Sequence, residues 1–151
     1  MNNTRRTVIK TTSALGTLVA LGLVTQQQAM AAVSRSAFDV KSIADAIKAI
    51  GGTPANSDQV SVVSPDIAEN GAVVPVGATS NLPNTTEIYL LVEKNPMPLA
   101  AGFIVPAGTE ASVQTRLKMG QSTNVVAVVK ADGKLFSATK ETKVTLGGCG
   151  G

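Results

Sequence analysis

The stretch NVVAVVKADGKLFSA, residues 124–138, decides the fold class. Two runs rich in valine and other apolar residues, Asn124–Lys130 and Lys134–Ala138, flank the dipeptide Asp132-Gly133. Valine is enriched in strands, and Asp-Gly between two such runs is a strong signal for a tight hairpin turn. We therefore expect an antiparallel β-hairpin in this part of the chain.

Further β-rich runs lie on both sides of this hairpin, separated mostly by the turn residues Gly, Pro, Asn and Asp. The expected strands are Gln59–Ser64, Ala72–Ala78, Thr86–Glu93, Ala100–Val105, Ala111–Lys118 and Lys143–Leu146. In Ala111–Lys118 the side chains Val113, Thr115 and Leu117 alternate with polar ones, as in a strand with one buried face. A spacing of about 8–12 residues between such runs is typical of an antiparallel β-sandwich.

One helix is expected before the strands, from Ser36 to Ile50. Four aliphatic residues in this segment recur at spacings of three and four and would share one face: Val40, Ile43, Ile47 and Ile50. Ser36 is a suitable N-cap, and Gly51-Gly52 can end the helix because glycine readily adopts the left-handed conformation found there. We expect this helix to pack on the sandwich.

The composition favours an aliphatic core and excludes several classes of site. Of the 151 residues, 44% are hydrophobic but only 3% are aromatic. With no histidine and one cysteine, the chain cannot form a Cys-His or Ser-His pair, a zinc or copper site of the usual ligands, or an intrachain disulfide. A calcium or magnesium site made of carboxylates alone is left open, although the chain has no EF-hand-like spacing. We expect no cofactor.

The positive net charge of +3 does not indicate a nucleic-acid-binding protein. Arg5, Arg6 and Lys10 lie in the first 31 residues, which contain no acidic residue. The rest of the chain has ten basic and ten acidic residues. A nucleic-acid-binding surface needs a surplus of cations to neutralise phosphates, so we do not expect a nucleic-acid partner.

Residues 1–31 are predicted to be a removable export signal. The segment Thr4–Lys10 resembles the bacterial twin-arginine motif, which directs folded proteins to the periplasm. The apolar stretch from about Ala14 to Val24 is shorter than the roughly 20 residues of a membrane span, although a retained anchor is the alternative. The triplet Ala29-Met30-Ala31 suits signal peptidase, so cleavage is expected after Ala31.

This cleavage leaves two expected parts, a sandwich domain with its N-terminal helix at 32–146 and a glycine-rich tail at 147–151. The tail has one cysteine, Cys149, among four glycines, Gly147, Gly148, Gly150 and Gly151. Glycine has no side chain to pack, so we expect a flexible arm that places the thiol about 10 Å beyond Leu146 when extended.

The tail thiol is expected to be accessible but not activated. No basic side chain lies closer in sequence than Lys143, so the pKa of Cys149 should stay near the free value of about 8.5. Such a thiol suits a group that is carried to other enzymes. The alternative is a structural β-sandwich module joined to another chain, or to a second copy as a dimer, by an intermolecular disulfide at Cys149.

Four stretches of the sequence carry a family resemblance. They are Pro65–Gly71, Asn95–Leu99, Arg116–Gly120 and the ending Val144–Gly151, which contains the motif GGCGG. Together with the twin-arginine segment they resemble SoxY, the carrier subunit of the bacterial thiosulfate-oxidising (Sox) system. The resemblance covers essentially the whole chain.

The resemblance implies an immunoglobulin-like sandwich that is not itself an enzyme and that pairs with a second subunit, SoxZ. It implies that Cys149 holds sulfur intermediates covalently while the flanking glycines form the carrier arm. It also implies transient partners: a haem cytochrome (SoxXA) that couples thiosulfate to the thiol, a manganese-dependent hydrolase (SoxB) that releases sulfate, and in some organisms a sulfane dehydrogenase (SoxCD). Haem and manganese are expected only in these partners.

The position of the SoxZ contact is left open by the sequence. Arg116, Lys118 and Met119 could belong to it, but charges on the solvent face of a strand are an equally simple explanation.

Overall fold

The structure is a computed structural model that describes residues 35–145. The expected export signal at 1–31 and the expected arm at 147–151 lie outside the described residues. The elements are a 3₁₀ helix η1 (Arg35–Phe38), the α-helix α3 (Ile43–Ile50) and nine strands, β1 (Ala55–Asn56), β2 (Val60–Val63), β3 (Ile67–Ala68), β4 (Val74–Ser80), β5 (Thr85–Val92), β6 (Leu99–Ile104), β7 (Ser112–Leu117), β8 (Thr123–Ala131) and β9 (Lys134–Val144).

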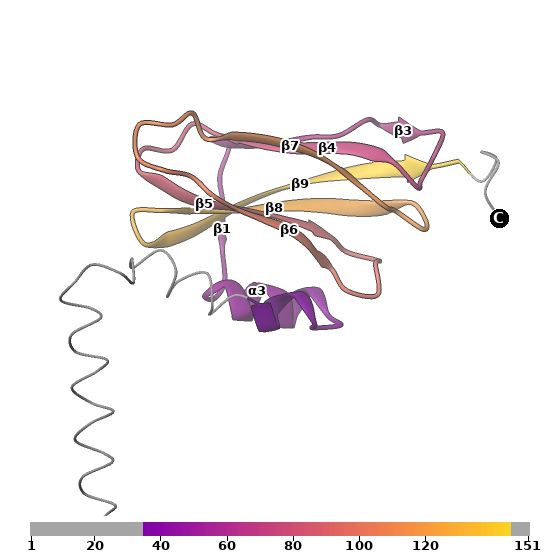
Figure 1. Cartoon of the computed structure of the whole chain (residues 1–151), viewed down its shortest axis with the longest axis horizontal. Helices are drawn as coiled ribbons and strands as arrows, with labels where there is room; N and C mark the ends of the chain where they lie inside the picture. The colour runs from indigo at the N-terminus through magenta and orange to yellow at the C-terminus, as the bar shows by residue number, and fades with distance from the viewer. Residues whose placement is uncertain (1–34, 146–151) are drawn as a thin grey trace, which may run out of the picture. The chain divides into compact units, whose positions relative to one another are not determined.

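The strands form two sheets that pack face to face, and α3 adds a third layer (Figure 1). The larger sheet has the order β1-β9-β8-β5-β6, with the short β3 also pairing with β9, and the smaller sheet has the order β2-β4-β7. The pairings β8–β9, β5–β8, β5–β6 and β4–β7 are all antiparallel. The expected mainly β, immunoglobulin-like sandwich with one N-terminal helix is confirmed.

The two central strands of the larger sheet, β5 and β8, are buried on both faces. Their side chains alternate between two cores. Toward the smaller sheet point Ile88, Leu90, Val92, Val125, Ala127 and Val129, and toward α3 point Tyr89, Leu91, Val126 and Val128. The valine-rich run that begins at residue 124 is therefore a strand with no solvent face.

The helix is shorter than expected from the sequence. The α-helix begins at Ile43 rather than Ser36, because Ser42 is the N-cap and its Oγ accepts a hydrogen bond from the Asp45 backbone N–H at 3.1 Å. Gly51 ends it with a positive φ of 140°. Three residues of the expected apolar face are confirmed, since Ile50 is buried and Ile43 and Ile47 pack against the larger sheet. The fourth, Val40, packs on the same core but precedes the helix.

The strands differ from the expected runs in two respects. β9 is continuous from Lys134 to Val144, whereas the sequence predicted two strands separated by Thr139–Thr142. This polar segment stays in the sheet because it pairs with the start of β8, up to Thr123↔Thr142. The two-residue strands β1 and β3, which pair in parallel with β9, were not expected.

Candidate functional site

The predicted attachment residue Cys149 and its glycines lie outside the described residues. Thr145 is the last described residue and directly follows β9. Val144 and Thr145 are therefore the described residues closest in sequence to Cys149, and the segments that contact them form one region. We call this region the exit clamp and define it by Asp66–Gly71, Lys118–Ser122 and Lys143–Thr145.

Three consecutive backbone N–H groups at the end of β9 are hydrogen bonded. Those of Lys143 and Thr145 donate to the carbonyl oxygens of Asp66 (2.9 Å) and Ala68 (3.1 Å). The intervening N–H, of Val144, points the other way and donates to the Ser122 Oγ at 2.9 Å. The strand end is thus held from both sides up to the last described residue.

Backbone packing reinforces this arrangement at Gly71. Its carbonyl accepts a hydrogen bond from the Met119 N–H at 2.7 Å. A Cβ atom on Gly71 would overlap the Met119 carbonyl oxygen and lie 2.8 Å from the Val144 Cγ1. Glycine is required here because two backbone segments and the Val144 side chain meet without room for a methyl group.

Polar side chains of β9 fasten the segment that leads into β3. Lys140 Nζ donates to the Ser64 carbonyl oxygen at 2.6 Å and lies 3.0 Å from the Asp66 carboxylate. The Thr142 hydroxyl, which is fully buried, donates to the Ser64 Oγ at 2.9 Å. The Lys140–Asp66 pair is exposed and contributes little by itself, so the buried hydroxyl pair is the firmer link.

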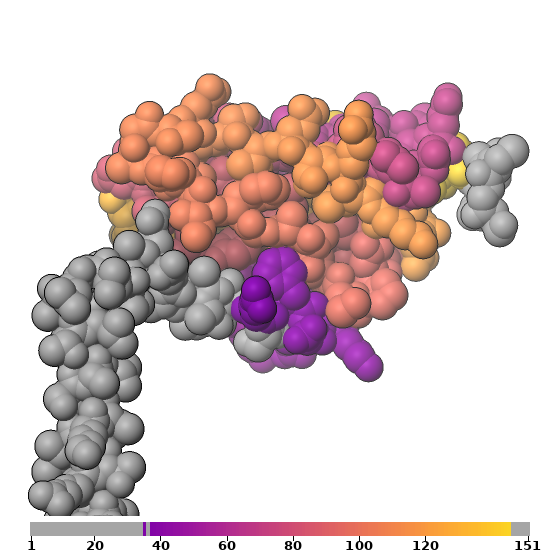
Figure 2. Space-filling view, in the orientation of Figure 1, coloured from indigo at the N-terminus to yellow at the C-terminus, as the bar shows by residue number. Residues whose placement is uncertain are grey.

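Another stretch that carries the resemblance, Asn95–Leu99, reaches the same end of the molecule. The Asn95 side-chain amide donates to the Lys118 carbonyl oxygen at 2.8 Å. Figure 2 shows the segments around residues 66–72, 94–98 and 118–122 gathered at one end of the sandwich. The exit clamp therefore brings together stretches that are far apart in the sequence, and no local sequence pattern predicts this contact.

Of the three residues considered for a partner contact, Met119 does not fit that interpretation. It is 1% exposed and belongs to the core between the sheets, whereas Arg116 and Lys118 are exposed. Met119 contributes to the exit clamp through its backbone, as described above.

Within residues 35–145, no group of three or more His, Cys, Asp or Glu side chains is placed to hold a metal ion. No helix in this described part of the chain is long and apolar enough to cross a membrane.

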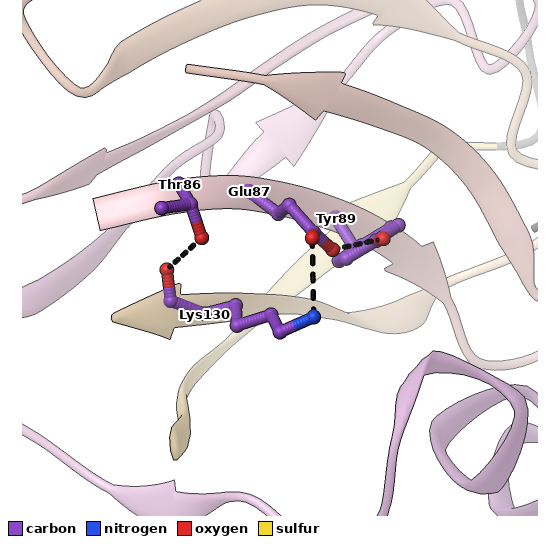
Figure 3. A network of polar contacts seen from close by, with 4 residues as sticks. All are labelled: Thr86, Glu87, Tyr89 and Lys130. Atoms are coloured by element: carbon purple, nitrogen blue, oxygen red, sulfur yellow. Dashed lines mark hydrogen bonds and ion pairs between the residues drawn. The ribbon is translucent and has the colours of Figure 1, made fainter. Parts of the chain in front are cut away.

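A second polar cluster lies where the start of β5 pairs with the end of β8 (Figure 3). Lys130 Nζ donates to the Glu87 carboxylate at 3.1 Å, and the Tyr89 hydroxyl donates to the other oxygen of the same carboxylate. The Thr86 hydroxyl donates to the Lys130 carbonyl oxygen at 3.3 Å. These groups satisfy one another, so the cluster stabilises the β5–β8 pair.

Tyr89 should not ionise in the folded protein at a pH just above 10.0, its ordinary pKa. Burial raises the pKa of Tyr89 far above this value, and the hydrogen bond to Glu87 and the negative charge of Glu87 raise it further. The contribution of this pKa shift to the free energy of unfolding is fully present below the ordinary pKa. It is lost as the pH rises toward the pKa of Tyr89 in the folded protein. The chain has one tyrosine and no tryptophan, so tyrosinate absorbance in the ultraviolet reports this residue alone.

The control for this titration is Glu87→Gln, which removes the charge but not the burial. Its titration midpoint should fall and still exceed the ordinary value, because burial is the largest cause of the shift. A midpoint near 10 in the native, folded protein would contradict the buried position of Tyr89.

Comparisons with known proteins identify the family. The model of the family described as sulfur oxidation protein SoxY matches residues 46–149. The solved structure of the sulfur carrier protein SoxY from Chlorobium limicola f. thiosulfatophilum is 38% identical, covers 68% of this chain and 94% of its own, and superposes with a TM-score of 0.61. No protein in the curated set matches.

A superoxide reductase (neelaredoxin) variant from Ignicoccus hospitalis also superposes, with a TM-score of 0.51 and 21% identity over 58% of this chain and 80% of its own. At this identity only the sandwich fold is shared. The SoxY matches agree with the resemblance found in the sequence, and the two stretches Pro65–Gly71 and Arg116–Gly120 meet in the exit clamp. The chain therefore belongs to the SoxY family of sulfur oxidation proteins, and it is a sulfur carrier protein rather than an enzyme.

Proposed function

We propose that this protein carries sulfur intermediates of thiosulfate oxidation as covalent adducts of Cys149. The observation that carries the proposal is that the family match extends to residue 149 and so includes the one cysteine of the chain. A thiol is the side-chain group suited to hold sulfur reversibly, since S–S bonds form and break under mild conditions.

The loading step is an oxidative coupling. The Cys149 thiol loses its proton, and its sulfur bonds to the terminal sulfur of thiosulfate. The product is a thiosulfonate-capped cysteine, and two electrons pass to the haem cytochrome. Hydrolysis then breaks the bond between the terminal sulfonate and the adjacent sulfur, with water supplying the oxygen of the released sulfate and the proton of the remaining persulfide. These steps use the partners' haem and metal, and this chain supplies the attachment point.

Residues 147–151 serve in this proposal as the carrier arm and residues 32–146 as the body, after removal of 1–31. Cys149 is four positions beyond Thr145, so the thiol reaches at most about 14 Å from the exit clamp. The glycines keep the arm slender on both sides of the sulfur, which allows it to enter a narrow active site.

The proposal places the protein in the periplasm, where the twin-arginine segment Thr4–Lys10 would direct it. SoxZ is the proposed permanent partner, and SoxXA, SoxB and, where present, SoxCD are the proposed transient partners. Arg116 and Lys118 are exposed and remain proposed contact residues.

Loading is tested by incubating the mature protein, with its SoxZ partner, with the partner cytochrome and thiosulfate. We expect the C-terminal peptide to gain the mass of a sulfur atom and a sulfonate group, and a reductant should remove it. Omission of the cytochrome is the control. An unmodified peptide, together with non-reducing electrophoresis showing an obligatory disulfide dimer, would instead favour a structural cross-link.

A further inference from the structure

We propose that Ser122 and Gly71 are positioning residues, which fix the direction in which the carrier arm leaves the sandwich. This inference rests on the proposed function of Cys149. Neither residue is close to Cys149 in sequence, and the described structure places both against Val144, five residues before the cysteine.

Ser122 acts on the strand end through its hydroxyl. β9 is paired with β8 as far as Thr142, and beyond this point β8 supplies no further partner on that side. The Ser122 Oγ takes over by accepting from the Val144 N–H at 2.9 Å and donating weakly to the Val144 carbonyl oxygen at 3.5 Å. One side chain therefore continues the hydrogen bonding of β9 on this side from Thr142 to Val144.

Gly71 acts on the same residue by close packing. The absence of a side chain at Gly71 lets the Met119 backbone and the Val144 side chain approach it together. Val144 is half-buried and packs against the core between the sheets. Any side chain at position 71 would displace one of these groups and change the position of Val144 relative to the body.

A fixed base matters because the arm is short. The body must be docked on a partner enzyme while the thiol, at most about 14 Å from Thr145, enters that enzyme's active site. Val144 and Thr145 are held by hydrogen bonds before the body docks. Docking therefore does not have to order them, and the entropic cost of ordering each residue is avoided. Fraying of the strand end should therefore weaken productive docking without changing the chemistry once the thiol is in place.

The first test compares Ser122→Ala with Ser80→Ala. Ser80 is the matched control, because its hydroxyl also accepts a hydrogen bond from a backbone N–H, that of Leu82, at 3.3 Å. Ser80 is the last residue of β4, whereas Gly71, in the exit clamp, lies before the start of this strand. In the loading reaction with thiosulfate, Ser122→Ala should raise the KM of the partner cytochrome for this protein severalfold, up to about tenfold, and leave kcat unchanged. Ser80→Ala should leave this KM unchanged. Ser122→Thr, which keeps the hydroxyl, should have the KM of the parent protein.

Two further measurements separate positioning from folding and from thiol chemistry. Amide hydrogen exchange at Val144 should be faster in Ser122→Ala than in the parent protein, while the reaction of Cys149 with a small disulfide reagent should be unchanged. Unchanged KM despite faster exchange at Val144 would overturn the positioning role. Absence of loading in the parent protein would instead overturn the proposed function itself.

The second test uses Gly71→Ala and Gly77→Ala. A methyl group at Gly77 would overlap the Val113 carbonyl oxygen in the middle of the β4–β7 pair, so both variants force a similar backbone displacement. Gly71→Ala should raise KM for loading, and Gly77→Ala should lower stability without this effect. Equal changes in KM for the two folded variants would show that general loosening, not positioning, is responsible.

Discussion

Replacing Cys149 with serine is expected to abolish loading of thiosulfate and to leave the fold unchanged. Serine has nearly the same size, but its hydroxyl cannot form the S–S bond on which the proposed adduct depends. The two cores and the exit clamp are formed by residues 35–145, so the replacement changes none of the residues that form them. Thiosulfate oxidation reconstituted with all partners should fall to the level seen without this protein.

A thiol at the base of the arm provides the matched control. The double variant Cys149→Ser with Thr145→Cys moves the only thiol to an exposed position whose backbone N–H is bonded to Ala68. We expect this thiol to react with small reagents but not to be loaded, because it cannot leave the surface of the sandwich. Loading of the double variant, or oxidation by Cys149→Ser alone, would contradict a carrier role for the arm.

The replacements Leu90→Ala and Leu91→Ala are each expected to lower the free energy of unfolding by about 2–5 kcal/mol. Both side chains are fully buried in β5, Leu90 between the two sheets and Leu91 between the larger sheet and α3. In a sandwich with one solvent-exposed face per sheet, one of two neighbouring residues would tolerate truncation. Here α3 covers the second face of the sheet, so both residues are buried. Urea unfolding should therefore show comparable losses of the free energy of unfolding for the two variants.

Ile104→Ala is the control for this pair. Ile104 lies on β6 of the same sheet but is 54% exposed, so its truncation should change the free energy of unfolding by less than about 1 kcal/mol. A negligible loss for Leu91→Ala beside a large loss for Leu90→Ala would mean that α3 does not pack on the sheet.

The sequence predicted the long strands well because their pattern is local. The run Asn124–Lys130 lies within β8, and Asp132-Gly133 forms the turn before β9, with both residues at positive φ. The helix start was misplaced, although Ser42 followed three residues later by Asp45 is itself a capping signal. The two-residue strand β3 could not be predicted, because it exists only through its pairing with Lys143 and Val144.

The candidate site likewise has one part that can be predicted from the sequence and one part that cannot. Cys149 is identifiable from the sequence because it is the only cysteine and is surrounded by glycine. The exit clamp is not, because Ser122, Gly71 and Ala68 approach Val144 and Thr145 from segments 22 to 77 residues away in sequence. No local pattern marks Ser122 as a hydrogen-bond partner of a strand end.

The double-sided burial of β8 also constrains the order of events during synthesis. Two of the partners of the layer formed by Ala46 and Ile50, namely Val126 and Val128, lie about 80 residues later in the chain. The N-terminal layer, which directly follows the proposed leader, therefore cannot complete its packing until the ribosome has released residue 128. A chain built in this way is suited to transport after translation, by a machinery that accepts finished folds.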